Sequence, residues 1–133
     1  MTIREMLEAH PQPSGGDRDV IVRCIEACID SAAARTSCAD ADLGESDLPK
    51  LVRCIRLCLD CADICDATGR IVIRQTESEG SVVRATVEAC VTICRACREE
   101  CERHAEHHEH CRICAQSCSR CEQACNELLG SID

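Results

Sequence analysis

The sequence predicts an all-α protein: an up-down-up-down four-helix bundle with a short extra helix at its N-terminus. Three stretches repeat cysteine at steps of three and four residues, and such steps return to one face of an α-helix because each residue turns it by about 100°. Short turn-forming segments separate the long stretches, as in antiparallel bundles. The 133 residues suit one core, so we expect a single domain over residues 1–133.

The short first helix is expected over residues 2–10. Thr2 can cap its N-terminus and Glu5 lies three residues later, as in a capping box. Pro and Gly over residues 11–16 then break the chain. Whether this helix packs near the closed end of the bundle or along its side is left open by the sequence.

The bundle is expected over residues 17–132, where caps and turns bound four long helices. These helices are expected over about residues 17–41, 46–75, 81–104 and 110–129. Asp17 caps the first of them, and Ser46 or Asp47 opens the second with proline in its first turn. Ser81 caps the third, and Gly130 ends the fourth.

Cysteine occupies the interior positions of all four helices. The chain has 16 Cys and no Phe, Tyr or Trp, so it lacks the side chains that normally bury the most area in a core. The cysteines are Cys24, Cys28 and Cys38; Cys54, Cys58, Cys61 and Cys65; Cys90, Cys94, Cys97 and Cys101; and Cys111, Cys114, Cys118, Cys121 and Cys125. We expect their thiols to line a common lumen where a bundle would normally carry Leu and Ile.

The two ends of this lumen are expected to differ, because the helices alternate in direction. Apolar residues should gather as a plug at one end: Val20, Ile21, Val72, Val83, Val87, Leu128 and Ile132. Asp42, His104, His108, His110 and Cys111 should form a polar mouth at the other end. We predict that His104, His108 and His110 are ligands for metal uptake. His104 and His108 are ranked above His110 because they are in helical phase with the cysteines. His10 and His107 are expected to be exposed.

Composition excludes several function classes. The formal net charge is −9 and Lys50 is the single lysine, so neither a nucleic-acid surface nor a polybasic membrane patch is expected. The apolar runs are far shorter than the roughly 20 residues that span a bilayer. The N-terminus has no signal-peptide pattern. We therefore expect a cytoplasmic protein with reduced thiols, where cysteine clusters serve metal binding or redox chemistry.

Four interpretations of the thiols compete. Buried cysteine can act simply as a small hydrophobe, which suits one or two residues better than a repeat on four helices. Disulfides within a helix are disfavoured, because Cβ atoms four residues apart lie about 5–6 Å from each other and a disulfide needs about 3.5–4.5 Å. Zinc or mixed-metal sites need about four ligands each, yet this repeat has no natural end. A thiol redox sensor needs an exposed, low-pKa cysteine.

Cu(I) accounts for the repeat best. This soft ion prefers thiolates and accepts two or three of them, so cysteines four residues apart can clamp one ion between two helical turns. A stack of such pairs would hold a file of ions. Neutral thiols also pack well, so the metal-free bundle can fold and then release protons as metal binds.

Two segments resemble a known family. Residues 60–70, DCADICDATGR, and residues 104–125, HAEHHEHCRICAQSCSRCEQAC, are similar to segments of the cytosolic, cysteine-rich copper storage proteins. The resemblance implies many Cu(I) ions per protomer held by thiolates in the bundle, uptake at the histidine-bearing end, a homotetramer, and storage or sequestration rather than catalysis. A copper donor or acceptor would be the expected partner.

The first long helix departs from the family pattern. Ser31, Arg35 and Asp42 occupy positions where the family would carry cysteine. Ser31 is a poor ligand for a soft ion, and Arg35 stays charged and cannot ligate. Arg35 is expected either to reach the mouth or to balance the negative charge of copper–thiolate units. Asp42 is expected to attract cations or to lie at a solvated helix end, and fewer sites are expected on the mouth half of the lumen.

Overall fold

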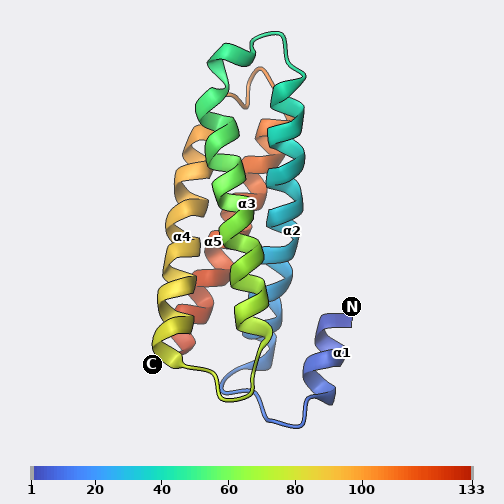
Figure 1. Ribbon diagram of the computed structural model, residues 1–133, viewed down its shortest axis with the longest axis vertical. Coiled ribbons are helices and arrows are strands. Elements are labelled where there is room, and N and C mark those ends of the chain that lie inside the picture. The colour runs from blue at the N-terminus through green and yellow to red at the C-terminus, as the bar shows by residue number, and fades with distance from the viewer. Residues whose placement is uncertain (1, 133) are drawn as a thin grey trace.

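The computed structural model describes residues 2–132, and within this range all regular secondary structure is helical. The elements are α1 (Thr2–Ala9), α2 (Arg18–Leu43), the 3-10 turn η1 (Leu48–Lys50), α3 (Val52–Ile73), α4 (Gly80–Glu102) and α5 (Glu109–Ser131). The four long helices lie side by side (Figure 1). α2 and α4 each pack against both α3 and α5. The predicted four-helix bundle with a short extra helix is confirmed.

The connections define the two ends of the bundle. The segments after α2 and after α4 lie together at one end, and the segment after α3 lies at the opposite end with the start of α2 (Figure 1). No helix within residues 2–132 has the length and apolar character needed to cross a membrane. The ends of a lumen between the helices are thus formed by different sets of residues.

The start of α3 differs from the prediction. The chain does not begin an α-helix at Ser46 or Asp47. It forms η1 first, with Pro49 near its start, and the α-helix begins only at Val52. The Leu51 N–H closes η1 with a backbone hydrogen bond of 2.8 Å, and the Leu51 side chain is fully buried. The short turn thereby brings an apolar side chain into the interior before α3 starts.

Three other helix ends also differ. Glu79, not Ser81, caps α4, because the Glu79 carboxylate accepts a hydrogen bond from the Ser81 N–H at 3.3 Å. α4 ends at Glu102, so His104 lies in the following turn instead of the helix. α5 continues through Gly130, because backbone hydrogen bonding extends past this glycine to residue 132. Gly130 was expected to end the helix.

The short helix α1 packs along the side of α2, near its N-terminal end (Figure 1). Leu7 is buried at the contact with 3 % exposure, and Arg4 Nη1 donates to Asp19 Oδ1 at 2.6 Å. Both groups of this ion pair are largely exposed, so solvent screens most of its contribution. The single buried leucine therefore accounts for most of the attachment.

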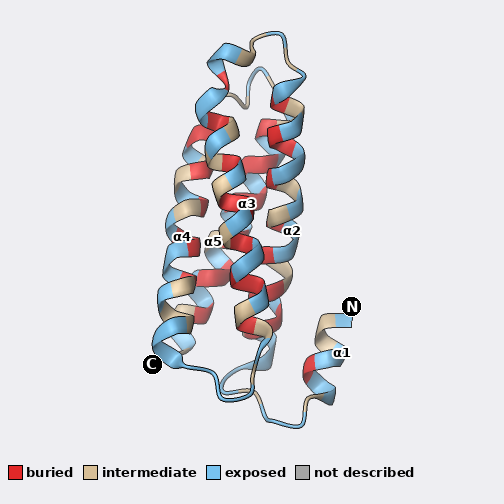
Figure 2. Ribbon diagram, in the orientation of Figure 1, coloured by how far each residue is buried: buried red, intermediate tan, exposed pale blue. Residues whose placement is uncertain are grey.

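Buried side chains form a continuous core along the facing sides of the long helices (Figure 2). The apolar plug lies at the end where α2 begins, and its expected members Ile21, Val72, Val87 and Leu128 are buried. The expected members Val20, Val83 and Ile132 are only half-buried. Val22 and Ile25, which were not predicted, are fully buried. The side chains that α2 contributes to the apolar plug therefore lie further along the helix than the helical register predicted.

Candidate metal centre

The thiols line the interior of the bundle throughout its length. All 16 cysteines are free and buried, none with more than 2 % exposure. The hydrogen-bonded sulfur pairs are 3.7–4.0 Å apart, far beyond the roughly 2.05 Å of a disulfide. The lumen is therefore built from separate thiols in van der Waals and weak hydrogen-bond contact.

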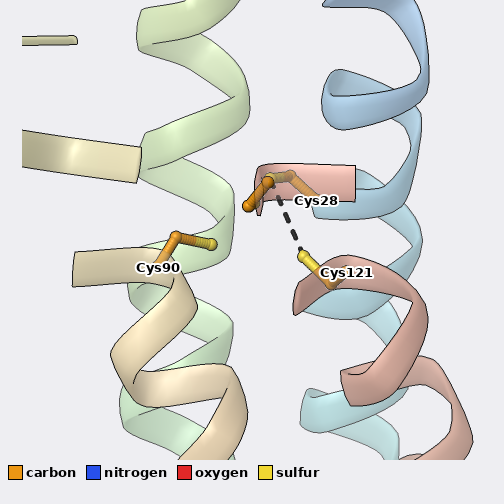
Figure 3. A group of neighbouring side chains, drawn as sticks. Cys28, Cys90 and Cys121 are labelled. Carbon is orange, nitrogen blue, oxygen red and sulfur yellow. Dashed lines mark hydrogen bonds between the residues drawn. The ribbon is translucent and has the colours of Figure 1, made fainter. Parts of the chain in front are cut away.

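Toward the plug, the thiols form groups drawn from several helices. The ligand atoms of Cys28, Cys90, Cys121 and Cys125 all lie within 4.8 Å of one another. Figure 3 shows three of these side chains converging from α2, α4 and α5, with the Cys121 thiol donating to the Cys28 sulfur at 3.9 Å. A second group joins Cys65, Cys90, Cys94 and Cys121. The shared members make the groups overlap, so an ion could pass between them by exchanging one ligand at a time.

The thiols near the mouth are grouped in the same way. Cys58, Cys97, Cys101 and Cys114 form one group and Cys38, Cys54, Cys58 and Cys101 another. Pairs four residues apart on one helix also touch, as at Cys97 and Cys101, 4.0 Å apart. The predicted clamp between successive turns is thus present, but most sulfur contacts join different helices. A soft ion with two or three thiolate ligands fits both arrangements.

Neighbouring thiols control one another's protonation. The Cys125 thiol, 3.8 Å away, lowers the pKa of Cys24 to about 5 by hydrogen bonding to its sulfur. The Cys121 thiol raises the pKa of Cys28 instead. Adjacent buried thiolates repel one another, so a dry cluster ionises only partly until a cation arrives. Metal binding must therefore displace protons from most of these sulfurs.

His110 is the histidine that reaches the thiols. Its Nδ1 lies 3.3 Å from the Cys38 sulfur and 3.7 Å from the Cys111 sulfur. Its Nε2 lies 2.9 Å from a Glu45 carboxylate oxygen. When Nε2 carries the proton, the carboxylate accepts a hydrogen bond from it. The lone pair of Nδ1 then points toward the sulfurs, an arrangement that outer carboxylates also impose on metal-bound histidines.

His104 and His108 instead contact carboxylates. His108 Nε2 lies 3.0 Å from Asp47 Oδ2, and its Nδ1 lies 3.1 Å from a Glu45 oxygen. His104 Nε2 lies 2.9 Å from Glu100 Oε2. No thiol is hydrogen-bonded to either ring among residues 2–132, so the contacts favour His110 over the two histidines ranked first from sequence phase.

Glu100 was missed by the sequence interpretation. It is 6 % exposed, and its carboxylate contacts His104 in the turn after α4. Because α4 ends at Glu102, helical spacing does not by itself predict this contact. Among the other histidines, His107 is exposed as expected. His10 is half-buried and accepts a hydrogen bond from the Gln12 N–H at 3.0 Å, against the expectation of exposure.

A sequence model described as copper storage protein matches residues 17–130, which is nearly the whole bundle. The chain belongs to the copper storage protein family. The resemblance seen in the sequence is therefore confirmed.

Solved members of the copper storage protein family share the fold. The copper storage protein Ccsp from Streptomyces lividans, loaded with 10 copper equivalents, is 48 % identical with a TM-score of 0.94, over 96 % of this chain and 98 % of that one. The Cu(I)-bound copper storage protein BsCsp3 is 39 % identical with a TM-score of 0.71, over 80 % and 94 % of the two chains. The uncharacterised cysteine-rich protein YhjQ of Bacillus subtilis is 36 % identical over 105 residues, covering 79 % of this chain and 92 % of YhjQ.

Asp42 lies against the thiols at the mouth. It is fully buried, so the expected solvated helix end is wrong. Its Oδ1 accepts from the Cys111 thiol at 3.7 Å, and its Oδ2 has no partner. Burial, aided by the Cys54 thiol, raises the pKa of Asp42 to about 7. This carboxylate is grouped with Cys38, Cys54 and Cys111, and it adds a hard oxygen donor at the mouth.

Ser31 and Arg35 are also fully buried in the copper storage lumen. The Cys65 thiol donates to Ser31 Oγ at 3.5 Å, which places Ser31 toward the plug instead of the mouth half. Arg35 Nε donates to the Cys118 sulfur at 3.0 Å, and its Nη2 donates to the Cys114 carbonyl at 2.8 Å. The Arg35 guanidinium has no contact with solvent, so the expectation that this side chain could reach the mouth is wrong.

Proposed function

We propose that this protein is a cytoplasmic store for Cu(I), binding many ions through cysteine thiolates inside the bundle. The overlapping groups of four buried ligand atoms within 4.8 Å of one another carry the proposal. Each of these groups offers three or four sulfur donors, enough for a soft monovalent ion that takes two or three, and the overlap extends the capacity along the lumen. The copper-loaded relatives support the same choice of metal.

The proposed ligands are the 16 thiols together with His110 at the mouth. His110 supplies a neutral nitrogen donor beside Cys38 and Cys111. His104 and His108, held by carboxylates, would take copper only in passing and hand it inward. Each thiol that binds releases its proton, so copper uptake acidifies the medium.

We propose that residues 1–133 act as one functional unit and assemble into a homotetramer, receiving copper from a donor protein or small thiol complex. The matching family is named for storage, and the mechanism is ligand binding rather than catalysis. Location in the cytoplasm is supported by the Streptomyces lividans relative, described as a cytosolic copper storage protein. Reduced thiols in that compartment keep the lumen ready for Cu(I).

The alternatives are less well supported. Zinc sites would use about four ligands per ion and isolate each site, whereas these groups share members. A redox sensor requires an accessible thiol, and every cysteine of the chain is buried. Neither alternative explains why thiols continue along the whole bundle.

Anaerobic titration with Cu(I) against a chromophoric Cu(I) chelator tests the proposal. We expect uptake of many equivalents, up to about one per thiol, with a matching release of protons. Protein whose thiols were alkylated in denaturant before refolding serves as the control and should take up little copper. Saturation of the unmodified protein at one or two equivalents would reject the storage function.

A further inference from the structure

Arg35 places a permanent positive charge inside the thiol lumen. It extends from α2 to α5, where its guanidinium donates to the Cys118 sulfur and to the Cys114 carbonyl. A third contact, 3.4 Å, returns to the Ser31 carbonyl on its own helix. The side chain has no exposed surface, so these contacts replace its hydration and fix it at one level of the bundle.

The guanidinium stays charged at this position. Burial lowers the pKa of Arg35, but the nearby sulfurs raise this pKa by more than burial lowers it, so the net shift is upward. The sulfurs are those of Cys118, Cys114, Cys61 and Cys97. Arginine does not lose its proton in proteins. Whatever enters the lumen must therefore pass or accommodate a fixed cation.

The sulfur contacts fall into two networks on either side of Arg35. The plug-side network contains Cys24, Cys28, Cys61, Cys65, Cys90, Cys94, Cys121 and Cys125. The mouth-side network contains Cys38, Cys54, Cys58, Cys97, Cys101, Cys111 and Cys114. Within residues 2–132, no thiol–thiol hydrogen bond of 4.0 Å or less joins the two networks.

Cys118 lies at the boundary, because its sulfur accepts a hydrogen bond from Arg35 at 3.0 Å. It also interacts with Cys61 of the plug-side network and with Cys97 of the mouth-side network. Arg35 contacts the Cys118 sulfur and the Cys114 carbonyl, and its charge interacts with Cys61 and Cys97. The step from Cys97 through Cys118 to Cys61 therefore runs beside the guanidinium.

We propose that Arg35 divides the lumen into two chambers, a mouth chamber that exchanges Cu(I) readily and a plug chamber that loads and empties slowly through the level of Arg35. This inference rests on the proposed storage of Cu(I). An ion moves by exchanging one thiolate for the next, and midway it is held by the fewest thiolates. At that point the guanidinium repels it, and Cys118, which already accepts from Arg35, is a poorer relay ligand.

Chelator competition on the copper-loaded protein tests the barrier. The fully loaded protein, without oxygen, is mixed with excess chromophoric Cu(I) chelator and followed in time. We expect a fast phase from the mouth chamber and a slow phase from the plug chamber. Arg35→Leu removes the charge without adding a copper ligand, so the slow phases of both release and loading should quicken by about tenfold, with total capacity unchanged.

Matched variants separate the barrier from other effects. Arg120→Leu removes a charge two residues from Cys118 on the exposed face of α5, where its side chain is 62 % exposed, and should leave both phases unchanged. Cys90→Ser in the plug chamber should lower only the slow amplitude, and Cys101→Ser in the mouth chamber only the fast one. These two variants test the chambers even if Arg35→Leu does not fold.

The outcomes separate the barrier from the storage function. Saturation of the unmodified protein at one or two Cu(I) equivalents would reject the storage function itself. High capacity with a single release phase, or with Cys90→Ser and Cys101→Ser lowering the same phase, would reject the two chambers alone. An Arg35→Leu protein that folds normally and releases copper faster but loads it no faster would overturn the barrier, because Arg35 would then act only as a counter-charge for bound copper.

Discussion

Replacing Leu128 with alanine should reveal how much the apolar plug stabilises a core made largely of thiols. Leu128 is on α5, is 2 % exposed and belongs to the continuous buried core. A buried Leu→Ala change loses the transfer free energy of the removed atoms and leaves a cavity, costing about 2–5 kcal/mol. We expect about 3 kcal/mol for Leu128→Ala, because the neighbouring helix ends allow some collapse into the space.

Urea denaturation of the metal-free, reduced protein measures this change. For a chain of this size the slope is about 2 kcal/mol per molar urea, so the midpoint should fall by about 1.5 M. Ile113→Ala on the same helix is the control, because Ile113 is 49 % exposed and its loss should move the midpoint by less than about 0.3 M. A shift for Leu128→Ala as small as that of the control would refute the plug as a source of stability. Cu(I) capacity should be unchanged, since the plug supplies no ligand.

Two further predictions concern the mouth. His110→Ala should slow Cu(I) loading in stopped-flow mixing by about threefold to tenfold while lowering capacity by at most about one ion, because it removes the nitrogen 3.3 Å from the Cys38 sulfur. His107→Ala is the control, since His107 is exposed. Equal loading rates in the two variants would contradict the role of His110 in copper uptake. Asp47→Asn should lower the pKa of His108 in an NMR titration, because the Asp47 carboxylate raises it. The pair stabilises the fold fully between about pH 3.9 and about pH 6.5, the ordinary pKa values of Asp and His. This stabilisation is lost as pH falls through the lowered pKa of Asp47 and as pH rises through the raised pKa of His108. The variant should therefore differ from the parent at pH 6 and converge with it at high pH; an unchanged His108 titration would contradict the prediction.

The four-helix bundle could be predicted because its repeat is local. Cysteine at steps of three and four residues specifies both the helix and the side of it that must face inward. The start of α3 could not be predicted in this way. Pro49 is compatible with the first turn of an α-helix and with a 3-10 turn alike, and the choice depends on the burial of Leu51, which arises from packing between helices.

The thiol lumen followed from the same repeat, but the role of each histidine did not. Helical phase assigned His104 and His108 to the thiol stripe, yet α4 ends at Glu102, and phase has no meaning beyond the end of a helix. The contact between His110 and Cys38 joins residues 72 positions apart. It depends on how α5 packs against α2, and a local pattern in one sequence carries no record of such a contact.

A store must remain folded both when it is empty and when it is full. Thiols meet this need because a neutral cysteine packs as a small hydrophobe and becomes a ligand by losing one proton. Each ion held by two thiolates adds one net negative charge to the lumen. The guanidinium of Arg35 can offset that charge where it lies, whereas cysteine at the same position would add another thiolate. At Arg35, α2 thus supplies a fixed cation and no ligand, so negatively charged copper–thiolate units would be held beside a charge of opposite sign.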